Sequence, residues 1–378
     1  MISGYAFSKQ GISHRLRNIP CQDSSVYFKL SEHWHLIAVA DGVGSCKHSD
    51  IASQIAVDTL CRFIGYAFPF HAKEEDLISL LRTAFHASAN FVEKYVIKKG
   101  ETLQEYHTTL CAAIYNDSGD LYYANAGDSG IIALGYNGIY QILSQKSQNE
   151  YGEVYPLSSR RFEIGKADFR VAAAACLTDG LLDWIVPDSL SEHKFKVYVP
   201  RARIIINHHL FERERQITEK SIALLGNTIC NRISVLAKDF GDGKKEHEQY
   251  GFLSEGNLLD DLSAAVVINT DAPLNSEHIL WEEPTLLTVE QQYLLQYRKF
   301  KAIYKERAEK PFLREIMALN PQFDADKIEK LINSIHELDK GKGTKREEAK
   351  THSHTKSISA KCASIMSVFK KRRRRLSQ

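Results

Sequence analysis

Residues 35–42 read His35-Leu36-Ile37-Ala38-Val39-Ala40-Asp41-Gly42, an apolar run that ends in an aspartate and a glycine. Apolar runs of this length are typical of buried β-strands, so we expect the carboxylate of Asp41 at a strand end, on the rim of a sheet. Three further segments also place an aspartate at the end of an apolar run. They are Ala126-Gly127-Asp128-Ser129, Thr178-Asp179-Gly180 and Asp260-Asp261.

Aspartates gathered at one rim would repel one another, and the loss of water would strengthen the repulsion, unless a cation lies between them. A metal site is the simplest explanation, and ligands that are all oxygen favour a hard ion such as Mg²⁺ or Mn²⁺. Taken alone, Asp41 or Asp179 favours a simple Asp-Gly turn at a strand end. Asp128 is equally consistent with a residue that caps a turn.

The composition is that of a soluble globular protein. The 378 residues are 43% hydrophobic and 25% charged, enough for one large core and a smaller appended region. No uncharged apolar stretch is long enough to cross a bilayer, and the N-terminal residues lack a signal-peptide pattern. The seven cysteines are scattered and form no CxxC pair, which favours reduced thiols and gives no sign of zinc. We therefore expect a cytoplasmic protein.

The charge is distributed unevenly along the chain. Residues 340–378 contain thirteen Lys or Arg and two Glu, a balance of +11, which leaves −9 for residues 1–339 of the net +2. An acidic body with a basic tail indicates two parts with different tasks. A solvated tail is the simpler interpretation; an anionic membrane or an acidic protein are its candidate partners, and nucleic acid is not expected.

Residues 1–272 are predicted to form one domain of mixed secondary structure. The expected strands are 24–30, 35–41, 108–116, 119–126, 129–135, 170–178 and 262–269, and the expected helices are 49–64, 76–99 and 212–238. Hairpin turns at Asn116-Asp117-Ser118-Gly119 and Tyr136-Asn137-Gly138 indicate an antiparallel sheet. Strands, then helices, then further strands favour an α+β layered sandwich.

The last third of the chain has a different character. Residues 284–338 are predicted to be a helical accessory region, because they are rich in Lys, Glu and Gln and are interrupted by Pro311 and Pro321. Residues 339–378 are expected to be a basic, disordered tail.

Six motifs occur in a fixed order. They are Gly11-Ile12-Ser13-His14 with Pro20-Cys21-Gln22-Asp23-Ser24, Val39-Ala40-Asp41-Gly42-Val43-Gly44-Ser45, His107-Thr108-Thr109-Leu110, Ala124-Asn125-Ala126-Gly127-Asp128-Ser129, Leu177-Thr178-Asp179-Gly180-Leu181-Leu182-Asp183 and Asp260-Asp261-Leu262-Ser263. Their order and spacing resemble the metal-dependent serine/threonine protein phosphatases of the 2C type, the PPM family, over about residues 1–270. One such motif is weak, whereas six in register are specific. The form of residues 14–23 is most similar to a divergent, mainly bacterial branch.

The resemblance implies a four-layer sandwich with two central antiparallel sheets, helices on both outer faces, and two Mn²⁺ or Mg²⁺ ions at one end. By position, Asp41 would bridge both ions and the carbonyl of Gly42 would complete the second. Asp179 and Asp260 would hold the first ion, although a shift of one residue would give this role to Asp261.

Further roles follow from the same resemblance. Asp128 would join Asp179 at a third, weaker metal that some members bind. Asp23 would orient the water that the metals bind. Thr108 and Thr109 are expected to be structural, with hydroxyls that bond near the site.

The arginine that family members use to clamp phosphate is displaced, since Asn18 occupies its place. His14, Arg15 or Arg17 could substitute, and we favour His14 as the catalytic contact to phosphate. The alternative for His14 is a hydrogen-bonded structural histidine.

Two other departures concern the chemistry. Val43 stands where many members have a histidine that is proposed to protonate the leaving oxygen, and Gln22 replaces the glutamate that usually precedes Asp23. These changes motivate an alternative function, a catalytically weak phosphatase-like module for binding or regulation. A third hypothesis, from another class, is a metal-dependent nuclease assisted by the basic tail.

The favoured prediction is a Mn²⁺- or Mg²⁺-dependent phosphatase that acts on phosphoserine and phosphothreonine, with a phosphorylated protein as partner. Two cations ~3.5–4 Å apart can lower the pKa of a bridging water and neutralise phosphoryl oxygens. Catalysis then requires positioning and charge stabilisation without a covalent phosphoenzyme. Residues 144–169 are predicted to form a mobile flap that controls substrate access.

Overall fold

The structure is a computed structural model, and it describes seven segments of the chain between residues 1 and 274. They are residues 1–69, 71–144, 146–147, 154–186, 196–206, 218–241 and 260–274. The predicted helical region 284–338 and the basic tail 339–378 lie outside the described residues, so these two predictions stay untested. The end of the predicted phosphatase domain, at residue 272, falls inside the last described segment.

Two five-stranded sheets form the centre of the fold, and all neighbouring strands in both are antiparallel. One sheet has the order β1-β10-β9-β6-β7, with β1 Ile2–Lys9, β6 Gly130–Gly135, β7 Tyr140–Ile142, β9 Val171–Leu177 and β10 Leu262–Asn269. The other has the order β2-β3-β4-β5-β8, with β2 Ser24–Lys29, β3 Trp34–Ala40, β4 Leu110–Asn116, β5 Leu121–Ala126 and β8 Glu163–Lys166.

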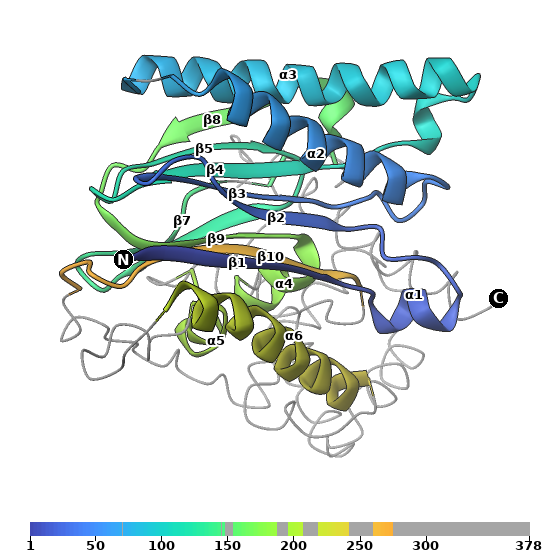
Figure 1. The fold of residues 1–378 in the computed structure, drawn as a ribbon. Helices are drawn as coiled ribbons and strands as arrows, with labels where there is room; N and C mark the ends of the chain where they lie inside the picture. Colours follow the sequence, from blue (N-terminus) through green and yellow to red (C-terminus); the bar gives the residue numbers. More distant parts are fainter. Residues whose placement is uncertain are drawn as a thin grey trace, which may run out of the picture. The chain divides into compact units, whose positions relative to one another are not determined.

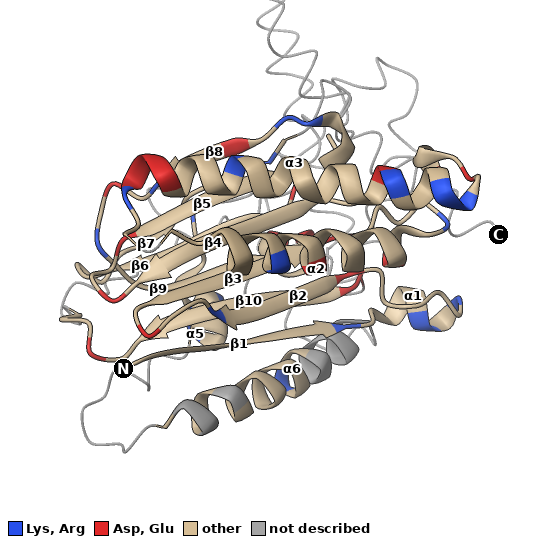
Figure 2. Ribbon diagram, turned by 45° about the horizontal axis from the view of Figure 1, so that its top comes forward, with Lys and Arg blue, Asp and Glu red and all other residues tan. Residues whose placement is uncertain are grey.

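Helices cover the outer face of each sheet, as Figure 1 shows. Helices α2 (Ser49–Ala67) and α3 (Glu74–Lys99) lie over the sheet that contains β3, and Figure 2 shows the same pair from a tilted view. On the other side lie α4 (Asp179–Ile185), α5 (Val199–Ile205) and α6 (Glu219–Gly241), while α1 (Ile12–Leu16) connects β1 to β2. Single 3₁₀ turns occur at Leu103–Glu105 and Leu157–Ser159. The predicted four-layer α+β sandwich is confirmed.

Strand β3 shows why the central runs of sequence are apolar without interruption. Ile37 and Val39 pack between the two sheets, whereas Leu36, Ala38 and Ala40 pack against the helices. Successive side chains of a strand point to opposite faces, and both faces of this strand are covered. A strand in the middle of a four-layer sandwich therefore loses the alternation of polar and apolar residues.

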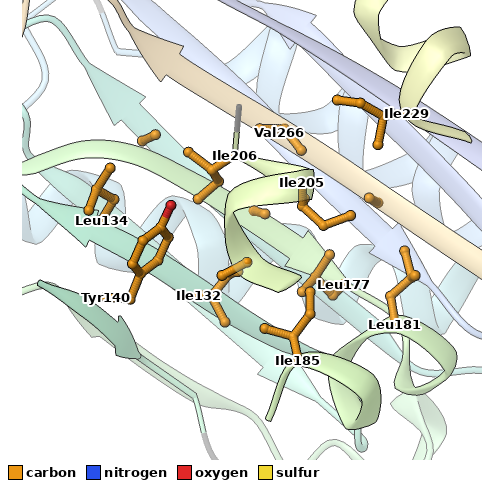
Figure 3. Packing of buried hydrophobic residues seen from close by; sticks show 14 of the residues in the cluster. Ile132, Leu134, Tyr140, Leu177, Leu181, Ile185, Ile205, Ile206, Ile229 and Val266 are labelled. Carbon is orange, nitrogen blue, oxygen red and sulfur yellow. The ribbon is translucent and has the colours of Figure 1, made fainter. Parts of the chain in front are cut away.

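Figure 3 shows the core between the sheet that contains β1 and the helices that cover its outer face. Ile132 of β6 and Leu177 of β9 project from the sheet toward Leu181 and Ile185 of α4 and Ile205 of α5. The short helices α4 and α5 thus cover this face of the sheet next to the C-terminal end of β9.

The predicted turns are present where the sequence placed them. Gly119 lies between β4 and β5 with a φ of 82°, and its N–H donates to the carbonyl of Asn116. Gly138, between β6 and β7, has a φ of 79°. Glycine adopts these left-handed conformations at little cost, so both hairpin predictions are confirmed.

Three strands were missed by the sequence analysis, and one prediction was partly wrong. Strands β1, β7 and β8 were not predicted, and β8 falls inside the proposed mobile flap 144–169. Residues 163–166 instead pair with Tyr122–Asn125 of β5 at the edge of the sheet. All four residues of β8 are only partly buried, which explains the lack of an apolar run in their sequence. Within the described residues, no helix is both long and apolar enough to cross a membrane.

Helix α3 allows a direct test of the core between this helix and the sheet that contains β3. Leu81 is completely buried against the sheet, whereas Ile97 on the same helix is 77% exposed. We expect Leu81→Ala to lower the free energy of unfolding by about 2–5 kcal/mol, because it leaves a cavity. Ile97→Ala should change it by less than about 0.5 kcal/mol. Urea denaturation of both variants measures the difference, and equal effects would contradict the assigned burial of α3.

Candidate metal centre

The predicted aspartates come together at one end of the two sheets, where strands of both sheets begin or end. Asp41 follows β3, Asp128 follows β5 with one residue between them, Asp179 is the first residue of α4, and Asp260 lies two residues before the start of β10. The register pairs Ala264 with Leu177, so the start of β10 lies beside the end of β9. In Figures 1 and 2 this is the end of the strands next to α1.

The electrostatics of Asp41 show how closely the acidic groups are gathered. Burial raises the pKa of Asp41 well above its ordinary value, and the carboxylates of Asp179, Asp23, Asp128 and Asp260 raise it further, in that order. Each of these charges lies near enough to repel the one on Asp41.

Asp179 and Asp23 show the same pattern. Burial is the main reason that the pKa of Asp179 is raised, followed by Asp128 and Asp260. Burial and the charge of Asp261 raise the pKa of Asp23 to about 7. A divalent cation among these oxygens would remove the repulsion, and carboxylates are the ligands that hard divalent ions prefer. The residues present therefore fit such a cation.

The backbone of Asp41 is held by two threonines of the segment before β4. The N–H of Asp41 donates to Thr109 Oγ1 at 2.9 Å, and Thr108 Oγ1 donates to the carbonyl of Asp41 at 2.9 Å. The N–H of Thr109 reaches the same carbonyl at 2.8 Å. The predicted structural role of both hydroxyls is confirmed.

Gly42 is required by its surroundings. Its N–H donates to the carbonyl of Gln22 at 3.1 Å, and it forms an isolated antiparallel bridge with Thr108. A Cβ atom at this position would lie 2.6 Å from the Gln22 carbonyl oxygen and 2.8 Å from the carbonyl oxygen of Ser49. Only a glycine fits between these two backbone segments.

Asp23 is buried and oriented by a residue that the sequence analysis did not consider. Thr178 Oγ1 donates to Asp23 Oδ2 at 2.8 Å and accepts a hydrogen bond from the N–H of Ser263 at 3.1 Å. The threonine that precedes Asp179 therefore joins β9, β10 and the segment before β2. The sequence offered one signal for this role: Thr178 stands directly before the predicted ligand Asp179.

The two consecutive aspartates before β10 have different environments. Asp261 is 3% exposed, and its carboxylate accepts hydrogen bonds from the N–H groups of Gly11 and Gln22, both at 2.6 Å. The Asp260 side chain is 30% exposed and lies near enough to Asp41 and Asp179 to raise the pKa of both. This arrangement favours Asp260 over Asp261 as the ligand; the assignment itself remains a prediction.

His14 lies on α1 and is 4% exposed. Its Nδ1 is 2.9 Å from Asp261 Oδ2, and its Nε2 is 3.6 Å from Asp260 Oδ1. The contact with Asp261 is the main cause of its raised pKa. The structure thus brings His14 to the acidic group, although with both ring nitrogens against carboxylates.

The first described residues of the predicted flap lie beside the acidic residues at the strand ends. Lys146 forms an ion pair with Asp183 of α4, whose charge in turn acts on Asp179. The N–H of Ser147 donates to the carbonyl of Gly127 at 2.8 Å. Residues 148–153 lie outside the described residues.

A second group of possible ligand atoms occurs away from the strand ends. His48, Glu101 and Glu105 each offer one atom within 4.8 Å of the others. Glu101 is already bonded by the hydroxyl of Tyr106 and lies 3.5 Å from His48 Nε2. These protein contacts account for the arrangement without an ion.

Comparison with known proteins identifies the family. A family model described as protein phosphatase 2C matches residues 10–210, which is more than half of the chain. The chain belongs to the protein phosphatase 2C family. The resemblance predicted from six motifs is therefore confirmed, and by family the chain is a protein serine/threonine phosphatase, of a class that uses divalent metal ions.

Solved structures of bacterial proteins, among them serine/threonine phosphatases, are similar to the chain at low sequence identity. The serine/threonine phosphatase Stp1 from Staphylococcus aureus has 14% identity and a TM-score of 0.46, over 71% of this chain and 95% of its own. PstP/Ppp from Mycobacterium tuberculosis has 16% identity and a TM-score of 0.44, over 71% and 98%. PppA from Pseudomonas aeruginosa has 16% identity and a TM-score of 0.45, over 71% and 97%. No curated protein sequence matches the chain.

The glycine in this phosphatase's Asp41-Gly42 pair provides a test of the site geometry. We expect Gly42→Ala to lower the free energy of unfolding by about 1–3 kcal/mol, because the added methyl group meets two backbone carbonyls. Gly44→Ala is the matched control, since its nearest neighbour would be the side-chain oxygen of Gln22 at 3.9 Å. Chemical denaturation measures both variants, and an unaffected Gly42→Ala protein would show that the loop is placed differently.

Proposed function

We propose that this phosphatase hydrolyses phosphoserine and phosphothreonine in proteins with a pair of Mn²⁺ or Mg²⁺ ions held at the strand ends. The observation that carries the proposal is the convergence of Asp179, Asp23, Asp128 and Asp260 on Asp41. Repulsion among buried carboxylates is unfavourable for a folded protein unless a cation compensates it. Membership of the family supports the substrate class, a phosphorylated protein.

The residues nearest the ions are assigned by position in the family motifs. Asp41 is proposed to contact both ions, with the carbonyl oxygen of Gly42 at the second, and Asp179 and Asp260 at the first. Asp128 is available for a third, weaker ion together with Asp179. When bound, a pair of divalent cations lowers the pKa of a bridging water and neutralises the phosphoryl oxygens.

Asp23 is proposed to orient the attacking water. Its carboxylate is buried and fixed by Thr178, so it can accept a hydrogen bond in only a narrow range of directions. A fixed acceptor holds the water in line with the phosphorus atom and reduces the entropy lost on reaching the transition state.

The leaving oxygen requires a proton from elsewhere. Val43 has no acidic hydrogen, and its N–H is bonded to the carbonyl of His107 at 3.0 Å. We therefore assign the proton to solvent water. This makes the leaving group of the substrate more important for the rate than in relatives with a histidine at this position.

The C-terminal residues are proposed to target or regulate the catalytic domain. Residues 284–338 and 339–378 lie outside the described residues, so this proposal is based on their composition alone. The basic balance of the tail favours an anionic membrane or an acidic protein as the partner.

Removal of the shared ligand tests the proposal. We expect Asp41→Asn to lower the rate on a phosphothreonine peptide by more than about 100-fold at saturating Mn²⁺, because loss of even a supporting residue at a metal site costs 10–100-fold. Asp117→Asn is the matched control, because Asp117 lies in the β4–β5 turn and pairs with His33. Wild-type activity should disappear with a chelator and return with Mn²⁺ or Mg²⁺.

Two results would contradict the proposal. Near-normal turnover by Asp41→Asn would show that the ligand assignment is wrong. No turnover by the wild type at any Mn²⁺ or Mg²⁺ concentration would instead support the alternative function, a phosphatase-like binding or regulatory module.

A further inference from the structure

Asp261 connects the N-terminal segment to the start of β10. Its two carboxylate oxygens accept hydrogen bonds from the N–H groups of Gly11 and Gln22, at the two ends of the connection between β1 and β2. Both bonds are 2.6 Å long and buried. Hydrogen bonds from N–H groups to a carboxylate are stronger than those to a neutral acceptor, so this side chain fixes residues 11–22 firmly.

His14 lies in the same segment, with one ring nitrogen near each of the two aspartates. Its Nδ1 is 2.9 Å from Asp261 Oδ2, and its Nε2 is 3.6 Å from Asp260 Oδ1. The N–H of Asp261 donates to the same Asp260 oxygen at 3.0 Å. Asp260 Oδ1 thus accepts a hydrogen bond from the backbone of Asp261, and the ring of His14 faces the same oxygen at ion-pair distance.

The contacts of Asp261 extend to the other proposed ligands. Both backbone groups of Gln22 are bonded: its N–H donates to Asp261 Oδ2, and its carbonyl accepts a hydrogen bond from the N–H of Gly42. The carbonyl oxygen of Asp261 lies so close to Gly180 that a Cβ there would be 2.3 Å away. Gly180 directly follows Asp179, and a bulkier residue would push β10 away from it.

His14 is poorly placed to clamp phosphate. Its side chain is only 5% exposed, and each ring nitrogen already lies within ion-pair distance of an aspartate. Both ring nitrogens are buried and face carboxylates, which would repel a phosphate group that approached them. The same contacts are well suited to hold a carboxylate in one orientation.

We infer that His14 and Asp261 are a positioning pair for the metal centre: they fix Asp260 and the backbone of Gln22, and His14 does not contact the phosphate. The inference rests on the proposed function, because Asp260 is taken as a ligand. Residues that orient metal ligands typically contribute 10–100-fold to metal affinity.

The test is Mn²⁺ binding by the full chain, followed by the electron paramagnetic resonance of free Mn²⁺, together with peptide hydrolysis. For His14→Gln we expect Mn²⁺ affinity to fall by about 10-fold or more. At saturating Mn²⁺ the KM for a phosphothreonine peptide should stay within about twofold of wild type, because substrate contacts are intact. A raised KM with unchanged Mn²⁺ affinity would instead assign His14 to the phosphate and overturn the inference.

The matched control is His33→Gln, which removes a histidine 2.8 Å from Asp117 at the opposite, exposed hairpin. It should change neither quantity. Asp261→Asn should also weaken Mn²⁺ binding. Because the two residues act through one contact, the variant that carries both substitutions should have the same Mn²⁺ affinity as whichever single variant binds Mn²⁺ less tightly. Additive losses would contradict the pairing.

The outcomes separate this inference from the proposed function. If the wild type binds Mn²⁺ and hydrolyses the peptide but His14→Gln binds Mn²⁺ normally, only the positioning pair is wrong. If the wild type binds Mn²⁺ without hydrolysing the peptide, the proposed function is overturned, while weaker binding by His14→Gln would still support the pair.

Discussion

Repulsion among the carboxylates at one end of the two sheets is the constraint on which the rest of the structure depends. Asp41 and Asp179 are surrounded by other acidic groups, and burial adds to the cost of their charges. Strands of both sheets deliver these residues to the same end, so the fold itself creates the repulsion. A cation that binds only the folded chain would reverse this cost and stabilise the protein by mass action. Folding and metal binding are therefore expected to be coupled.

The residues that hold this group in place mostly do so through neutral hydrogen-bonding groups. Asp41 is positioned through its backbone by the threonines at 108 and 109, and Asp23 by the hydroxyl of Thr178. Neutral donors fix the orientation of a carboxylate but leave most of its negative charge available to a metal ion. Asp261 differs from the other aspartates, because two backbone N–H groups occupy its oxygens. Among these aspartates, Asp261 thus holds segments of the chain together through its carboxylate.

The sequence predicted the fold well where both faces of a strand are buried. The run that ends at Asp41 and the turn at Asn137-Gly138 each carry a strong local signal, an uninterrupted apolar stretch in one case and a residue pair suited to left-handed backbone in the other. Strand β8 carried no such signal, because at a sheet edge its residues are only partly buried. The acidic cluster could be predicted from strand ends. The different environments of Asp260 and Asp261 could not, because Asp261 contacts residues about 240 positions away in the chain.

The central claim is that the aspartates at the strand ends hold a pair of divalent cations. Anomalous scattering from crystals of the protein grown with Mn²⁺ tests it most directly. The account predicts two manganese peaks ~3.5–4 Å apart, with Asp41 in contact with both and Asp179 and Asp260 in contact with one. A folded protein with no manganese peak among these carboxylates at saturating Mn²⁺ would contradict it.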